Sequence, residues 1–90
     1  MRNITLMIMV NYNSKNIPKC GLLGIGIDNK DEHTRITRGD NFYLHGGSEE
    51  THERMVETTV KFNEKLNAKG KQLENLSKNE FIDMISDSSE

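Results

Sequence analysis

The sequence predicts an α+β fold, in which a three- or four-stranded, mostly antiparallel sheet precedes one long helix and a short C-terminal helix. Two observations predict it. Residues before the Gly46-Gly47 pair alternate with the period of strands, whereas residues after it repeat apolar side chains at helical spacing. The element order is therefore β-β-β-β-α-α, with the long helix packed on one face of the sheet.

The first predicted strand, residues 4–12, carries apolar side chains on both faces. One parity includes Leu6 and Ile8, and the other includes Met7 and Met9. Because branched aliphatic residues are the usual core of a sheet, we expect the first parity to lie beneath the long helix. The methionines are then left on the uncovered face.

The other strands are predicted at 20–27, 33–38 and 42–45. A polar connection over residues 13–18 separates the first strand from the second. In the second strand, Gly24 and Gly26 share one face and leave a strip without side chains, where another segment of backbone can approach closely.

The last two strands are predicted to form a hairpin. A three-residue loop over 39–41 pairs Ile36 with Leu44 and places both on the same face as Phe42. A two-residue loop would divide these apolar side chains between the two faces, so the hydrophobic pattern favours the longer loop.

The long helix is predicted over residues 49–69. Ser48 is a good N-cap residue, and Gly70 is suited to the left-handed position after the last turn. The side chains expected to face inward are His52, Met55, Val56, Thr59, Val60, Asn63 and Leu66.

The short helix is predicted to begin at Ser77, which forms a capping box with Glu80. Its apolar side is expected to hold Phe81, Ile82, Met84 and Ile85, and Leu73 and Leu76 are expected to pin the connection. The chain is then a single domain over 1–90, with a sheet half at 1–47, a helical half at 48–86 and a frayed tail at 87–90.

Composition excludes several classes of protein. The net charge of −2 disfavours binding to nucleic acid through overall charge, and one cysteine permits no internal disulfide. No apolar run approaches the roughly 20 residues of a membrane span. We expect a cytoplasmic protein with no cofactor and no membrane association.

No catalytic signature is present, so the expected function is a non-catalytic protein-interaction module that binds a protein partner or forms a homodimer. The expected interface residues are Met7, Met9 and Tyr43. Cys20 begins an apolar strand with no neighbouring base in the sequence, which is typical of a buried small hydrophobic residue rather than a nucleophile.

Two alternatives remain open. The hairpin 33–45 gathers Arg35, Arg38 and Tyr43, a combination that can hold the phosphates and bases of single-stranded nucleic acid.

The second alternative is a metal or small-anion site at the strand-to-helix junction, residues 45–53. His45, Glu49, His52 and Glu53 are imidazole and carboxylate ligands at spacings that can converge. The glycines that lead into a helix N-terminus can also bind an anion with free backbone N–H groups.

Overall fold

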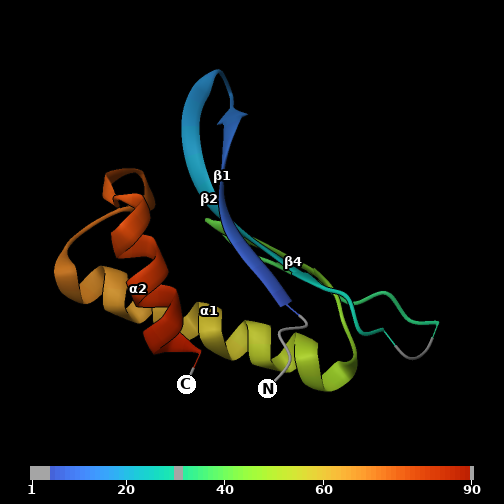
Figure 1. Ribbon diagram of the computed structural model, residues 1–90. Helices are drawn as coiled ribbons and strands as arrows, with labels where there is room; N and C mark the ends of the chain where they lie inside the picture. The colour runs from blue at the N-terminus through green and yellow to red at the C-terminus, as the bar shows by residue number, and fades with distance from the viewer. Residues whose placement is uncertain (1–4, 30–31, 90) are drawn as a thin grey trace.

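A computed structural model describes residues 5–29 and 32–89 of the chain. The strands form one mixed sheet in the order β1-β2-β4-β3, and two helices follow them, so the α+β prediction is confirmed (Figure 1). The predicted strand residue Ile4, the turn residues 30 and 31, and the tail residue Glu90 lie outside the described residues.

The elements are β1 (Thr5–Ser14), β2 (Ile17–Gly26), β3 (Ile36–Arg38), β4 (Phe42–Gly46), α1 (Glu49–Lys69), a 3₁₀ turn η1 (Leu73–Asn75) and α2 (Lys78–Ser88). The outer pairs, β1 with β2 and β3 with β4, are antiparallel, and the central pair, β2 with β4, is parallel.

The connection between β1 and β2 is shorter than predicted. Only Lys15 and Asn16 form the turn, with φ of 53° and 65°, and Ser14 pairs directly with Ile17. Two consecutive positive φ values are typical of the type I′ turn that matches the twist of a two-stranded hairpin. The polar residues at 13–18 therefore extend both strands instead of separating them.

The predicted register of the β3–β4 hairpin is wrong by one residue. Ile36 pairs with His45, and Thr37 pairs with Leu44. The Gly39 N–H donates to the Phe42 carbonyl oxygen at 3.0 Å, which continues this register to the Gly39–Phe42 pair and leaves only Asp40 and Asn41 to span the turn. As a result, Leu44 is fully buried beneath α1, whereas Ile36 lies on the opposite face of the sheet and is 52% exposed.

The boundaries of α1 are those predicted. The Ser48 side chain accepts a hydrogen bond from the Thr51 N–H, and Gly70 ends the helix with φ of 65°. The buried stripe is rotated from the predicted one, however: Phe62 is fully buried, and Val60 is 52% exposed. The side of α1 that is buried is therefore set by the positions of the sheet and of α2, which the apolar periodicity of the helix alone does not define.

The short helix also begins as predicted, with the complete Ser77 and Glu80 capping box. It continues beyond the predicted end at residue 86, because Ser88 is buried and its hydroxyl donates to the Met84 carbonyl oxygen at 2.7 Å. The expected frayed tail is therefore helical as far as Ser88. Of its predicted apolar residues, Ile82 is 49% exposed.

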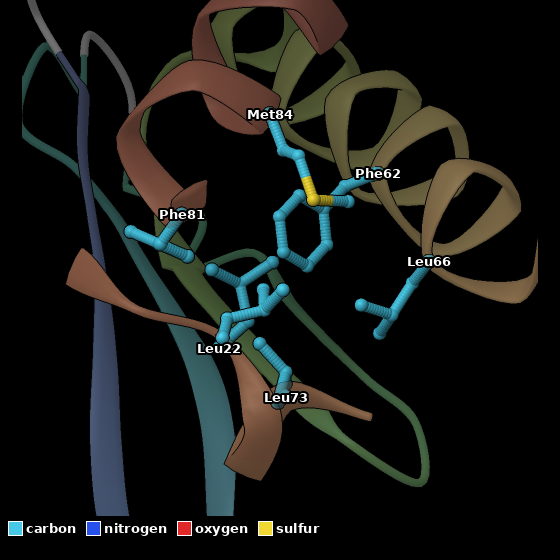
Figure 2. Close-up of a cluster of buried hydrophobic side chains, with 7 residues drawn as sticks. Leu22, Phe62, Leu66, Leu73, Phe81 and Met84 are labelled. Atoms are coloured by element: carbon cyan, nitrogen blue, oxygen red, sulfur yellow. The ribbon is translucent and has the colours of Figure 1, made fainter. Parts of the chain in front are cut away.

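Both helices pack against the same face of the sheet. Figure 2 shows the resulting core, with Phe62 of α1 and Phe81 of α2 beside Leu22 of β2. The two phenylalanine rings are arranged edge to face, with their centroids 5.6 Å apart. The cluster is completed by Leu66, Leu73, Leu76 and Met84. Leu73 and Leu76 pin the connection as predicted. Neither helix has the length and hydropathy of a membrane span, a finding limited to the described residues.

Candidate functional site

The second face of the sheet, turned away from both helices, carries large exposed hydrophobic side chains. Strand alternation and the pairing register assign its residues. They are Leu6, Ile8, Val10 and Tyr12 of β1, Ile17, Lys19, Leu23 and Ile25 of β2, Tyr43 and His45 of β4, and Ile36 and Arg38 of β3. We name this surface the open face.

The pairing arranges the open face in rows across all four strands. One row runs from Leu6 through Ile25 and His45 to Ile36, and its ends are 51% and 52% exposed. Aliphatic side chains of this size are usually removed from water in a folded domain. Their repetition on one side of the sheet makes a contiguous apolar surface rather than scattered exposure.

The predicted orientation of β1 is wrong. Met7 and Met9 are partly buried and pack against the helix-side core, whereas Leu6 and Ile8 are the exposed residues. The methionines, expected at an interface, therefore belong to the internal packing of the domain. Tyr43, the third expected interface residue, does lie on the open face.

The glycine strip of β2 explains this orientation. A Cβ on Gly24 would lie 2.7 Å from Met7 Sδ and from Leu44 Cδ2, and a Cβ on Gly26 would lie 2.6 Å from the Gly47 Cα. The helix side of β2 thus accepts neighbouring atoms closely because it lacks side chains there. The glycines at 24 and 26 are visible in the sequence, and the close packing that they permit outweighs the preference for branched residues in a core.

A shallow hollow of about 420 Å³ lies on the open face. Its lining includes Tyr12, Gly21, Tyr43 and Arg38. A Cβ on Gly21 would lie 3.0 Å from the Tyr12 ring, so the missing side chain makes room for that ring and for the hollow. The open face is therefore contoured, with two tyrosines at the sides of a depression.

The nucleic-acid candidates are only partly brought together. Arg38 pairs with Tyr43 on the open face, where the Tyr43 and His45 rings stack at 6.2 Å with 14° between their planes. Arg35 has the opposite parity, and its guanidinium donates to the Gly47 carbonyl oxygen at 3.3 Å. The rest of the open face is mainly aliphatic, a chemistry better suited to a protein surface than to bases.

The four metal candidates are not assembled into a site. Among the described residues, no three His, Cys, Asp or Glu side chains are grouped for a metal ion. His52 is buried, with Nδ1 2.9 Å from the Gly46 carbonyl oxygen and Nε2 2.8 Å from the Thr37 hydroxyl. Because a carbonyl only accepts, Nδ1 donates to Gly46, and in the neutral imidazole Nε2 then accepts from the Thr37 hydroxyl. His52 therefore ties α1 to β3 and β4, while His45 is exposed on the open face.

The expected anion position at the start of α1 is occupied by a carboxylate of the chain itself. Asp28 accepts hydrogen bonds from the Ser48 N–H at 2.9 Å, the Ser48 hydroxyl at 3.0 Å and the Thr51 hydroxyl at 2.7 Å. These bonds, that of the Ser48 N–H foremost, hold the pKa of Asp28 below its ordinary value. The sequence predicts Asp28 only as a turn residue, and its position shortly after a strand is the one sequence signal of this capping role.

Cys20 is partly buried on the helix side of β2. Burial, together with the nearby Glu74 carboxylate, raises the pKa of its thiol. A raised pKa reduces the thiolate fraction at neutral pH, which is the opposite of what an activated nucleophile requires. The side chain contributes instead to packing, as expected.

Comparison of the chain with protein-family models, curated proteins and solved structures finds no match.

Proposed function

We propose that the protein is a non-catalytic interaction domain that binds a second copy of itself through the open face. The observation that supports the proposal is the exposed surface of aliphatic side chains from β1, β2 and β3 with Tyr43 and His45 of β4 between them, in which Leu6 and Ile36 are 51% and 52% exposed. Removal of such a layer from water is the main favourable term in protein association.

The dimensions of the open face limit the contact that it can form. The ten-residue strands β1 and β2 are roughly 34 Å long, β4 and β3 have only five and three residues, and four strands at about 4.8 Å spacing are about 14 Å wide. The outline is on the order of 400 Å², which is comparable to the largest apolar patches of monomeric proteins and smaller than a standard interface of about 800 Å² per partner. We therefore expect moderate affinity.

A second copy fits the chemistry of this surface. Two sheets can pack face to face about 10 Å apart, and a two-fold axis then brings identical apolar centres together. The charged residues of the open face stand at its margins, with Lys19 toward the hairpin tip and Arg38 on the edge strand β3. Their positions allow both to remain in water when the aliphatic centre is covered.

Light scattering coupled to size-exclusion chromatography tests the proposal from about 10 μM to about 1 mM protein. We expect a mass that rises above the 10.3 kDa of one chain as the concentration increases. Ile36→Lys is the test variant, and Ile82→Lys on α2 is its matched control, because the two isoleucines are 52% and 49% exposed.

Full burial of an isoleucine is worth about 2 kcal/mol, so covering the exposed half of Ile36 contributes roughly 1 kcal/mol per copy. A two-fold dimer contains the change twice, and Ile36→Lys should weaken association by about 30-fold. Ile82→Lys should leave it unchanged. A protein that is monomeric throughout, or equal effects of the two variants, would refute the proposal. A monomer that binds single-stranded oligonucleotides at low salt would favour the nucleic-acid alternative instead.

A further inference from the structure

The two edges of the sheet differ in their protection against pairing with another chain. The β3 edge is three residues long and ends at Arg38. The β1 edge is ten residues long, and its sequence contains neither a charged residue nor a proline. Short length, charge and proline are the usual devices that prevent an edge from accepting a further strand, and β1 lacks all three.

The β1 edge is also regular. Its ladder with β2 runs without a bulge from the Thr5–Gly26 pair to the Ser14–Ile17 pair. In a hairpin with a two-residue turn, the residues that flank the turn form a hydrogen-bonded pair, so alternate residues from Ser14 direct their backbone groups toward β2.

The intervening residues, including Met7, Met9 and Asn11, direct their N–H and C=O groups outward. Over residues 6–13, no backbone hydrogen bond outside this ladder is present.

We propose that β1 pairs antiparallel with β1 of a second copy around a two-fold axis, which joins two sheets edge to edge. This contact uses a different surface from the open face, and neither contact requires the other. The chemistry on β1 supports a second copy as the occupant, because an uncharged strand meets no like charge when it faces itself and presents no charge that would select another partner.

In one register of this pairing, residues with outward backbone groups face each other along β1. With the two-fold axis at Met9, each Met7 faces Asn11 of the other copy, and all of these residues have outward backbone groups. The intervening positions place Ile8 opposite Val10 and Leu6 opposite Tyr12 on the open face, where such aliphatic and aromatic neighbours stabilise a sheet. The pairs formed by Met7, Met9 and Asn11 give about six backbone hydrogen bonds, a number within the range of specific interfaces.

Edge pairing has a consequence for the open face. A two-fold axis perpendicular to the sheet keeps the helices of both copies on one side and both open faces on the other. The apolar surface then continues across two chains, so edge pairing enlarges the surface available for the face-to-face contact.

Amide hydrogen exchange of the wild-type protein tests this inference without any substitution. The outward amides of Met7, Met9 and Asn11 should exchange rapidly at about 10 μM and at least tenfold more slowly at about 1 mM. The inward amides of Ile8 and Val10 are internal controls, since they bond to β2 at both concentrations. Outward amides that stay unprotected at 1 mM would overturn the edge pairing.

Asn11→Pro removes one outward N–H without removing a bond to β2, and proline is tolerated on an edge strand. We expect it to lower the light-scattering mass at 1 mM, whereas Asn11→Ala should not. The Ile36→Lys protein separates the two proposals, because edge pairing should persist when the face contact is weakened. Oligomers without protection of the outward amides would overturn edge pairing alone, and a wild-type monomer would overturn both contacts.

Discussion

The close approach between β2 and the entry to α1 can be tested with Gly26→Ala. The added Cβ would lie 2.6 Å from the Gly47 Cα and 2.9 Å from the Gly47 nitrogen. Both atoms belong to backbone, so ordinary contact requires the junction to retreat by roughly 1 Å. That junction is held by Asp28 on Ser48 and Thr51 and by His52 on the Gly46 carbonyl oxygen.

Overpacking of this kind costs about 1–3 kcal/mol, and a backbone neighbour places Gly26→Ala near the upper end. The matched control is Gly21→Ala on the same strand, where the nearest atom is in the Tyr12 ring at 3.0 Å. Because that exposed ring can turn, and because alanine lowers the entropy of the unfolded chain, we expect a change within about 1 kcal/mol.

Urea and thermal unfolding at one fixed protein concentration measure the difference between these variants. For a domain of this size, a loss of about 3 kcal/mol lowers Tm by roughly 12–24 °C. If Gly26→Ala were as stable as Gly21→Ala, the missing side chain at Gly26 would not determine how closely the helix entry approaches the sheet.

Two further predictions concern individual polar groups. The hydrogen bonds to Asp28 lower its pKa in the folded state, and Lys71, at 2.7 Å, does the same for Glu80. Their stabilising contributions are therefore present above the unfolded-state pKa values near 4 and are lost as the pH falls through the lower folded-state pKa values. Urea unfolding between pH 6 and pH 3 should show this decline in the free energy of unfolding, and Asp28→Asn should make the decline shallower. An equal dependence on pH in the variant and the wild type would contradict the role of Asp28. Thr59 is 1% exposed, and its hydroxyl has no hydrogen-bond partner among the described residues. Thr59→Val keeps the branched shape and should raise the free energy of unfolding by about 1 kcal/mol in the same assay. A decrease would indicate that the hydroxyl does have a hydrogen-bond partner.

The local sequence determined the helices of this protein and their ends. Ser48, Gly70 and Ser77 act within one turn of their own positions, so the N-caps and the left-handed C-terminal residue could be predicted without knowledge of the fold. The strands of the first half could be recognised for the same reason, because alternation is a property of consecutive residues.

The tertiary structure decided which face of each element is buried. In β1 both parities are apolar, so alternation is satisfied by either orientation, and the close packing of Met7 against Gly24 favours the one that places the methionines in the core. In α1 the choice between Val60 and Phe62 depends on where the sheet and α2 stand around the helix.

The elements of the candidate site likewise come together only in the folded chain. The parallel pairing of β2 with β4 brings Leu23 beside Tyr43 and completes the open face, although these residues are distant in the sequence. Asp28 and Ser48 meet in the same way. Backbone geometry and capping depend on neighbouring residues and can be predicted from the sequence. The burial of a side chain depends on a second surface, which the chain brings into contact with it only when it folds.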